Sequence, residues 1–230
     1  MIAATDTRPA TRRIRPFLAI APLAAALGAL GGLATSSPVF ALAGAAGGLV
    51  WTALAALLAG PLLRLRDRST VLPAAVALAA AFVTTLTLGA GLVQHLMYPT
   101  PEAYQALMRS PASGGATGLY MMINPLLEWL LIPAALTLAW RHTRQRRPLL
   151  IGATVYYLQR LTTYLYFAPT VLGWTTGSDA VPLSQVGLWL DLDLARMTLD
   201  LAVIVILATT ALRRHDQPAM TMPTPTSGCG

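Results

Sequence analysis

Hydrophobic residues along the chain fall into six long runs separated by short polar segments. The runs cover about residues 16–34, 38–63, 70–97, 118–140, 148–173 and 189–212. An α-helix of about 20 apolar residues crosses a bilayer core of about 30 Å, and backbone groups inside lipid must be paired internally. The pattern therefore predicts an all-α membrane protein with six transmembrane helices, in which the last four form a bundle beside an N-terminal helical hairpin.

The longest connection between the runs has the pattern of a short helix. Thr100 is a suitable cap, and Pro101 fits the first helical turn. Tyr104 and Leu107 would then share one helix face. A short amphipathic segment over residues 100–110 is therefore expected at the outer membrane surface.

These elements divide the chain into four parts. Residues 1–15 form a cytoplasmic N-terminal segment, 16–68 a transmembrane hairpin, 69–212 a four-helix bundle, and 213–230 a cytoplasmic tail that is expected to be disordered. The basic start and the first apolar run would also suit a cleaved signal peptide, but this run exceeds the usual signal core of about 7–15 residues. A retained first helix is therefore favoured.

Composition and charge support a membrane protein and argue against a nucleic-acid partner. Of the 230 residues, 55% are hydrophobic and 11% are charged, and the mean hydropathy is +0.60. The net charge of +7 comes from arginines that cluster between the runs. With six spans, the clusters near residues 8–15, 64–68, 141–147 and 213–214 lie on one side, and only Arg109 lies in a connection on the other. The positive-inside rule then places both termini in the cytoplasm and the protein in the cell inner membrane, with the lipid bilayer as its partner.

Ionisable residues in the last run are the main exception to the apolar pattern. Trp189, Asp193, Arg196 and Asp200 are spaced three or four residues apart, so they share one face of a helix. A charge at membrane depth is costly and normally faces the protein interior or a wet cavity. This stripe is therefore expected to face polar residues on neighbouring helices.

Helical rise of about 1.5 Å per residue places other polar residues in the same layer as the stripe, in the outer half of the bilayer. These residues are His95 at the rim, Asn124, Glu128 and Arg160. Tyr156 and Tyr164 share a stripe of their helix with Arg160. Each buried arginine needs a carboxylate and each carboxylate needs a donor, so an arginine–carboxylate network is expected. Because three deep carboxyl groups face two arginines, either Glu128 or Asp200 is expected to retain a proton at neutral pH.

No arrangement of residues in the sequence suits a metal or a cofactor. His95 and His142 lie near opposite surfaces, and Cys229 is the single cysteine. Zinc sites need several closely placed histidine or cysteine ligands, and no glycine-rich phosphate loop is present. The sequence therefore predicts neither a metal nor a cofactor, and it leaves the oligomeric state open.

The last two runs resemble the anthrone-oxygenase-like family of small bacterial and fungal membrane proteins. That family has Trp, then Asn, then Arg in its final helix at the spacing of Trp189, Asp193 and Arg196, so an aspartate here replaces the asparagine. Residues 163–170 resemble the family's threonine and Pro-Thr segment at the end of its penultimate helix. The asparagine that usually follows this segment is Val171 here.

The resemblance covers about residues 70–212 and implies a four-helix membrane bundle, linked in some members to cofactor-free oxygenation of polycyclic phenols. It implies that Arg196 steadies an enolate or phenolate and that Asp193 orients it. A small hydrophobic aromatic molecule would then be the ligand. The candidate catalytic residues are Arg196, Asp193, Glu128 and Arg160, and the candidate substrate-binding residues are Trp189, Tyr156, Tyr164, Asn124, His95 and Asp200.

Two other functions are consistent with the same residues. A small transporter would use Glu128 and Asp200 as proton or cation sites, and a structural or assembly subunit would use the network to fix helix packing. An apolar cavity of some hundreds of Å³ beside Arg196 would favour the enzyme. A continuous water path to both faces would favour transport, and a dry, filled core would favour the structural role.

Overall fold

The computed structural model describes residues 21–26, 28–30, 38–66, 69, 71–140, 143–176 and 181–212. The expected N-terminal segment 1–15 and C-terminal tail 213–230 lie outside these residues. All regular structure in the described part of the chain is helical, as the hydrophobic runs predicted.

The helices follow one another with short connections. The first three elements are α2 (Pro38–Arg66), α3 (Leu72–Met97) and the short α4 (Pro101–Met108). The next long helix consists of α5 (Ala112–Pro125), the π-helical segment η1 (Leu126–Leu131) and α6 (Ile132–Ala139). The remaining elements are α7 (Thr143–Thr162), the π-helical segment η2 (Thr163–Phe167), α8 (Ala168–Thr176) and α9 (Leu183–Leu212).

Among the described residues, four helices are long and apolar enough to cross a membrane. Their apolar parts are Ala41–Leu65, Leu72–Met97, Ala112–Ala139 and Leu183–Leu212. They correspond to the second, third, fourth and sixth predicted spans, although the fourth begins at Ala112 instead of 118.

The fifth predicted span, 148–173, is helical but is not among these four helices. Its helix already begins at Thr143, so its first turns contain arginines, and Arg160 lies further along it. These charges lower the hydropathy of the segment below that of the other long helices. The first predicted span, 16–34, lies partly outside the described residues, and a shorter apolar helix is present within it at Ala21–Leu30.

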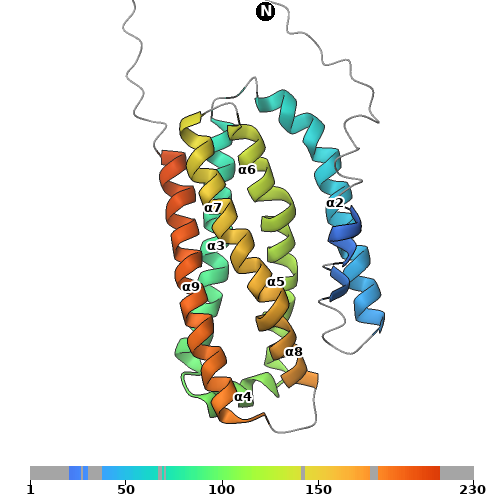
Figure 1. The fold of residues 1–230 in the computed structure, drawn as a ribbon, viewed down its shortest axis with the longest axis vertical. Coiled ribbons are helices and arrows are strands. Elements are labelled where there is room, and N and C mark those ends of the chain that lie inside the picture. The colour runs from blue at the N-terminus through green and yellow to red at the C-terminus, as the bar shows by residue number, and fades with distance from the viewer. Residues whose placement is uncertain are drawn as a thin grey trace, which may run out of the picture.

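The long helices lie side by side and alternate in direction (Figure 1). We call α3, α5–η1–α6, α7–η2–α8 and α9 the bundle. The most extensive contact in it joins α3 to α9, and α9 also packs along α7 while α3 packs against α6. The α2 helix lies beside the bundle, against α6 and η1, and α4 crosses the end of the bundle where α8 ends and α9 begins.

Small residues let the bundle helices approach closely. Ala77 and Ala80 on α3 are buried in the main core cluster, which also draws on η1, α6, α7 and α9. Leu127, Tyr156 and Leu207 are among its largest fully buried side chains. Because lipid tails are as apolar as leucine, such close van der Waals packing supplies much of the attraction between membrane helices.

A second core cluster, called the α4 cluster below, joins α4 to the end of η2 and the start of α9. It consists of Tyr104, Leu107, Met108, Phe167, Val186, Trp189 and Leu190. The α4 helix begins with a cap, since the backbone N–H of Ala103 donates to the Thr100 hydroxyl oxygen at 3.3 Å. The short amphipathic helix expected over residues 100–110 is thus present, with its apolar face against the bundle.

Replacing Phe167 with alanine should lower the free energy of unfolding by about 3–5 kcal/mol, because the α4 cluster loses a buried ring. Phe167 is 8% exposed, whereas Phe82 on the surface of α3 is 64% exposed. Phe82→Ala is therefore the matched control and should change the free energy much less. Thermal unfolding in detergent measures both variants, and equal losses would contradict this placement of the two rings.

Candidate functional site

The first polar network surrounds the carboxylate of Glu128 on η1. Arg160 on α7 donates from Nε to Oε1 of Glu128 at 2.6 Å. The hydroxyl of Tyr164 donates to Oε2 at 2.8 Å, and the hydroxyl of Tyr157 donates to the backbone carbonyl of Glu128 at 2.6 Å. Glu128 and Arg160 are 6% and 7% exposed. Both oxygens of this buried carboxylate are therefore paired, as a charge removed from water requires.

Two π-helical segments carry this network, and a proline follows each of them. The segments η1 and η2 each end two residues before a proline, Pro133 and Pro169 respectively. A proline ring clashes with the carbonyl four residues earlier and offers it no N–H. In both helices that carbonyl belongs to the π-helical segment, whose wider turn accommodates the proline. The same widening sets the directions in which Glu128 and Tyr164 leave their helices.

The second network surrounds Asp193 on α9. His95, near the end of α3, places Nε2 at 3.0 Å from Oδ2 of Asp193. Arg196 donates from Nε to Oδ1 at 2.8 Å, and its Nη1 lies 3.8 Å from Oδ2 of Asp200. Asp193 thus has a partner on each oxygen, whereas Asp200 has a longer and weaker ion pair.

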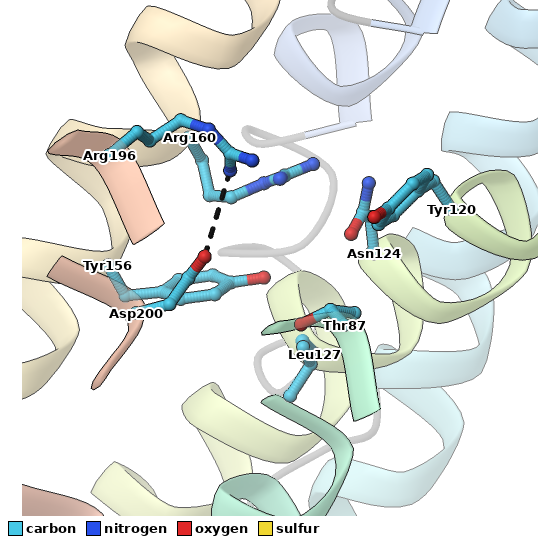
Figure 2. Close-up of a pocket in the computed structure, with 8 residues that line it drawn as sticks. All are labelled: Thr87, Tyr120, Asn124, Leu127, Tyr156, Arg160, Arg196 and Asp200. Atoms are coloured by element: carbon cyan, nitrogen blue, oxygen red, sulfur yellow. Dashed lines mark ion pairs between the residues drawn. The ribbon is translucent and has the colours of Figure 1, made fainter. Parts of the chain in front are cut away.

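Between the two networks lies a small polar cavity that every long helix of the bundle reaches (Figure 2). Its lining residues are Thr87, Tyr120, Asn124, Leu127, Tyr156, Arg160, Arg196 and Asp200. Its volume is about 10 Å³, which is enough for about one water molecule. The cavity therefore joins the two networks but leaves no room for an aromatic ring.

Two buried side chains at this level have polar atoms without a hydrogen-bond partner among the described residues. Tyr156 is 2% exposed, and its hydroxyl points toward the middle of the cavity without a partner (Figure 2). Gln159 is 1% exposed and lies beside Asp200, yet neither its amide oxygen nor its nitrogen has a partner at hydrogen-bond geometry. Unpaired buried polar groups are rare and costly. The cavity beside the Tyr156 hydroxyl has room for about one water that would pair with it, and the Gln159 amide has Asp200 as a polar neighbour.

The α4 cluster adjoins the second network at one end of the bundle. The ring centres of Tyr104 and Trp189 lie 5.2 Å apart. Burial raises the pKa of the Tyr104 phenol well above its usual range, and the nearby Asp193 carboxylate raises it further. Tyr104 therefore stays neutral, and its ring acts as part of the apolar cover over this end of the bundle.

Most of the residues that the sequence singled out lie in the two networks or line the cavity. These residues are His95, Asn124, Glu128, Tyr156, Arg160, Tyr164, Asp193, Arg196 and Asp200. Trp189 is the exception, because it lies in the α4 cluster among the rings of Tyr104, Phe167 and Trp174. It stands about one helical turn closer to the start of α9 than Asp193, which takes it away from the cavity.

Four polar residues of the site were not anticipated from the sequence; they are Thr87, Tyr120, Tyr157 and Gln159. For Tyr120 a signal was available, since it lies four residues before Asn124 and shares its helix face. For Tyr157 there was none, because its hydroxyl reaches a backbone carbonyl on another helix. A hydrogen bond to a backbone atom on another helix cannot be predicted from the pattern of residue types, because every residue carries the same backbone carbonyl.

No protein-family model, curated protein or solved structure matches this chain. The fold and the site define its class as a membrane protein, all-helical in its described part, whose bundle encloses two arginine–carboxylate networks. The resemblance to the anthrone-oxygenase-like family stays an expectation that rests on residues 163–170 and on the stripe of α9.

Tyr164→Phe should lower the free energy of unfolding by about 1.5–3 kcal/mol, because it removes a hydrogen bond to a buried carboxylate. Tyr156→Phe makes the same chemical change at a hydroxyl without a protein partner in the described residues, and it should cost less. Chemical unfolding in detergent compares the two variants with the unmodified protein. Equal losses in the two variants would mean that the Tyr156 hydroxyl has a strong partner, which would contradict the prediction.

Proposed function

We propose that this protein is a multi-pass protein of the cell inner membrane, in which the buried networks fix the packing of the helices, as in a structural or assembly subunit. The observation that carries this proposal is the pairing of Glu128 with Arg160 and of Asp193 with His95, each across two helices. The cavity beside these pairs has the size of one water. A paired and filled site supports a structural role over catalysis on a polycyclic aromatic, which needs a cavity of some hundreds of Å³.

The proposed topology has six transmembrane helices. The helix α7–η2–α8 runs between the same two ends as the four candidate spans, which supports its role as a fifth (Figure 1). The α2 helix ends, and α7 begins, at one end of the bundle, so Arg64 and Arg144 lie on the same side. Arg109 follows α4 at the opposite end. The positive-inside rule then assigns the end with more arginines, and both chain termini, to the cytoplasm.

Buried charge pairs can specify how two helices are aligned. A shift of one helical turn moves a side chain by about 5.4 Å, which would break the 2.6 Å contact between Arg160 and Glu128. A buried charge that loses its partner costs about 3–5 kcal/mol. Other alignments of α7 against η1 are therefore disfavoured. A shift of α3 against α9 would break the 3.0 Å contact between His95 and Asp193, but the penalty there is smaller because Asp193 keeps Arg196 on its own helix.

Arg160→Met and Glu128→Leu should each lower the free energy of unfolding by about 3–5 kcal/mol, because each leaves one buried charge unpaired. The double variant should recover most of that loss, since no buried charge remains. Arg109→Met, at an exposed position, is the control and should have little effect. Unfolding in detergent gives the energies, and cysteine cross-links between α6 and α7, which pack against each other, report the alignment. Single variants that unfold like the unmodified protein would refute the proposal.

A second candidate function is a cofactor-free, oxygenase-like enzyme that acts with dioxygen on a membrane-soluble phenolic molecule. The observation in its favour is that Arg160, Arg196 and the unpartnered hydroxyl of Tyr156 meet at one cavity (Figure 2). Three such donors suit the negative oxygen of a phenolate. Because side chains fill the space around this cavity, binding of the ring would require the neighbouring side chains to move.

If the enzyme hypothesis is right, Arg196→Lys should keep the fold yet abolish turnover, because lysine lacks the planar, two-pronged donor geometry of arginine. Mass spectrometry of small molecules extracted with the purified protein should then find an aromatic compound that is lost from the variant. No such compound in either preparation would favour the structural role.

Proton-coupled flux into liposomes that depends on Glu128 and Asp200 would instead indicate a transporter.

A further inference from the structure

The surface of α6 carries an open groove that takes no part in the two networks. Pro133, Leu136, Thr137 and Trp140 line it, and its volume is about 420 Å³. The Thr137 hydroxyl donates to the backbone carbonyl of Pro133 at 2.7 Å, so this polar group is satisfied within the helix. The groove therefore presents a mainly apolar surface to its occupant.

One end of this groove is cationic. Trp140 is 50% exposed and directly follows the candidate span Ala112–Ala139. The guanidinium carbon of Arg146 lies 5.3 Å from the ring centre of Trp140, and Arg144 and Arg147 are exposed in the first turns of α7. A tryptophan at a membrane interface needs no ligand by itself. An apolar groove that ends at a cluster of arginines is more specific, because it matches a molecule with an apolar chain and an anionic head.

We propose that this groove binds one anionic phospholipid, with an acyl chain along Leu136 and Pro133 and the phosphate at Arg146. Basic residues at the cytoplasmic membrane surface attract anionic headgroups, and guanidinium groups form strong, often paired hydrogen bonds to phosphate. A neutral phospholipid would gain nothing from the arginines, and a free phosphate would gain nothing from the groove. This inference rests on the proposed membrane topology but not on the proposed role of the buried networks.

Native mass spectrometry of the full chain, released from nanodiscs of phosphatidylcholine with and without phosphatidylglycerol, tests the charged part of the site. The protein should retain one phosphatidylglycerol in preference to phosphatidylcholine. Arg146→Gln should weaken this retention about fivefold, which corresponds to about 1 kcal/mol per basic residue near a membrane surface. Arg109→Gln removes an exposed arginine at the opposite end of the bundle and should leave retention unchanged.

A second pair of variants tests the apolar part. Leu136→Trp should fill the groove and displace the lipid, whereas Leu201→Trp, at a position on α9 that is 54% exposed, should not. Glycerol phosphate, which has the anionic head without an acyl chain, should not compete with phosphatidylglycerol.

Four results would overturn the proposal. Equal losses in Arg146→Gln and Arg109→Gln would mean general surface attraction, and equal retention of phosphatidylcholine would mean that the arginines do not select the lipid. Competition by glycerol phosphate would mean a phosphate site without a lipid chain. Unchanged retention in Leu136→Trp would mean that the lipid lies elsewhere.

Discussion

A charge that is buried between membrane helices must meet a partner, and this requirement organises the centre of the molecule. Arg160 meets Glu128 across α7 and η1 at 2.6 Å. Asp193 meets His95 across α9 and α3, the two helices with the most extensive contact in the bundle. Because an unpaired buried charge costs several kcal/mol, the first contact restricts how its two helices can be aligned. The second contact adds a smaller restriction, since Asp193 also pairs with Arg196 on its own helix. The water-sized cavity lies where the two constraints meet.

The π-helical segments show how a local defect can serve this arrangement. Pro133 and Pro169 each deprive a helix of one backbone hydrogen bond, and the chain accommodates each proline by widening the preceding turn. The widened turns carry Glu128 and Tyr164, which form a hydrogen bond of 2.8 Å to each other. A regular α-helix would aim both side chains differently, so the prolines contribute to the network although they do not touch its polar atoms.

The two ends of the bundle differ in chemistry. At one end, α4 and the α4 cluster cover the Asp193 network with tyrosine, tryptophan and phenylalanine rings. At the other end, arginines precede the core of α7, and an apolar groove on α6 opens beside them. The first end encloses the polar centre, and the second carries exposed positive charge. This asymmetry separates the proposed role of the buried networks from the proposed lipid site at the groove.

Hydrophobic runs and helical spacing, taken alone, determined the long helices, the amphipathic α4 and the faces that carry Arg160, Asp193 and Arg196. They could do so because a helix of 3.6 residues per turn fixes which side chains share a face. They could not determine that Arg160 meets Glu128, that the remaining cavity has the size of one water, or that Trp189 lies outside it. Only the tertiary structure decided these points. Alignment between helices to within less than one turn depends on how all their side chains pack together, and the period of a single helix does not determine that packing.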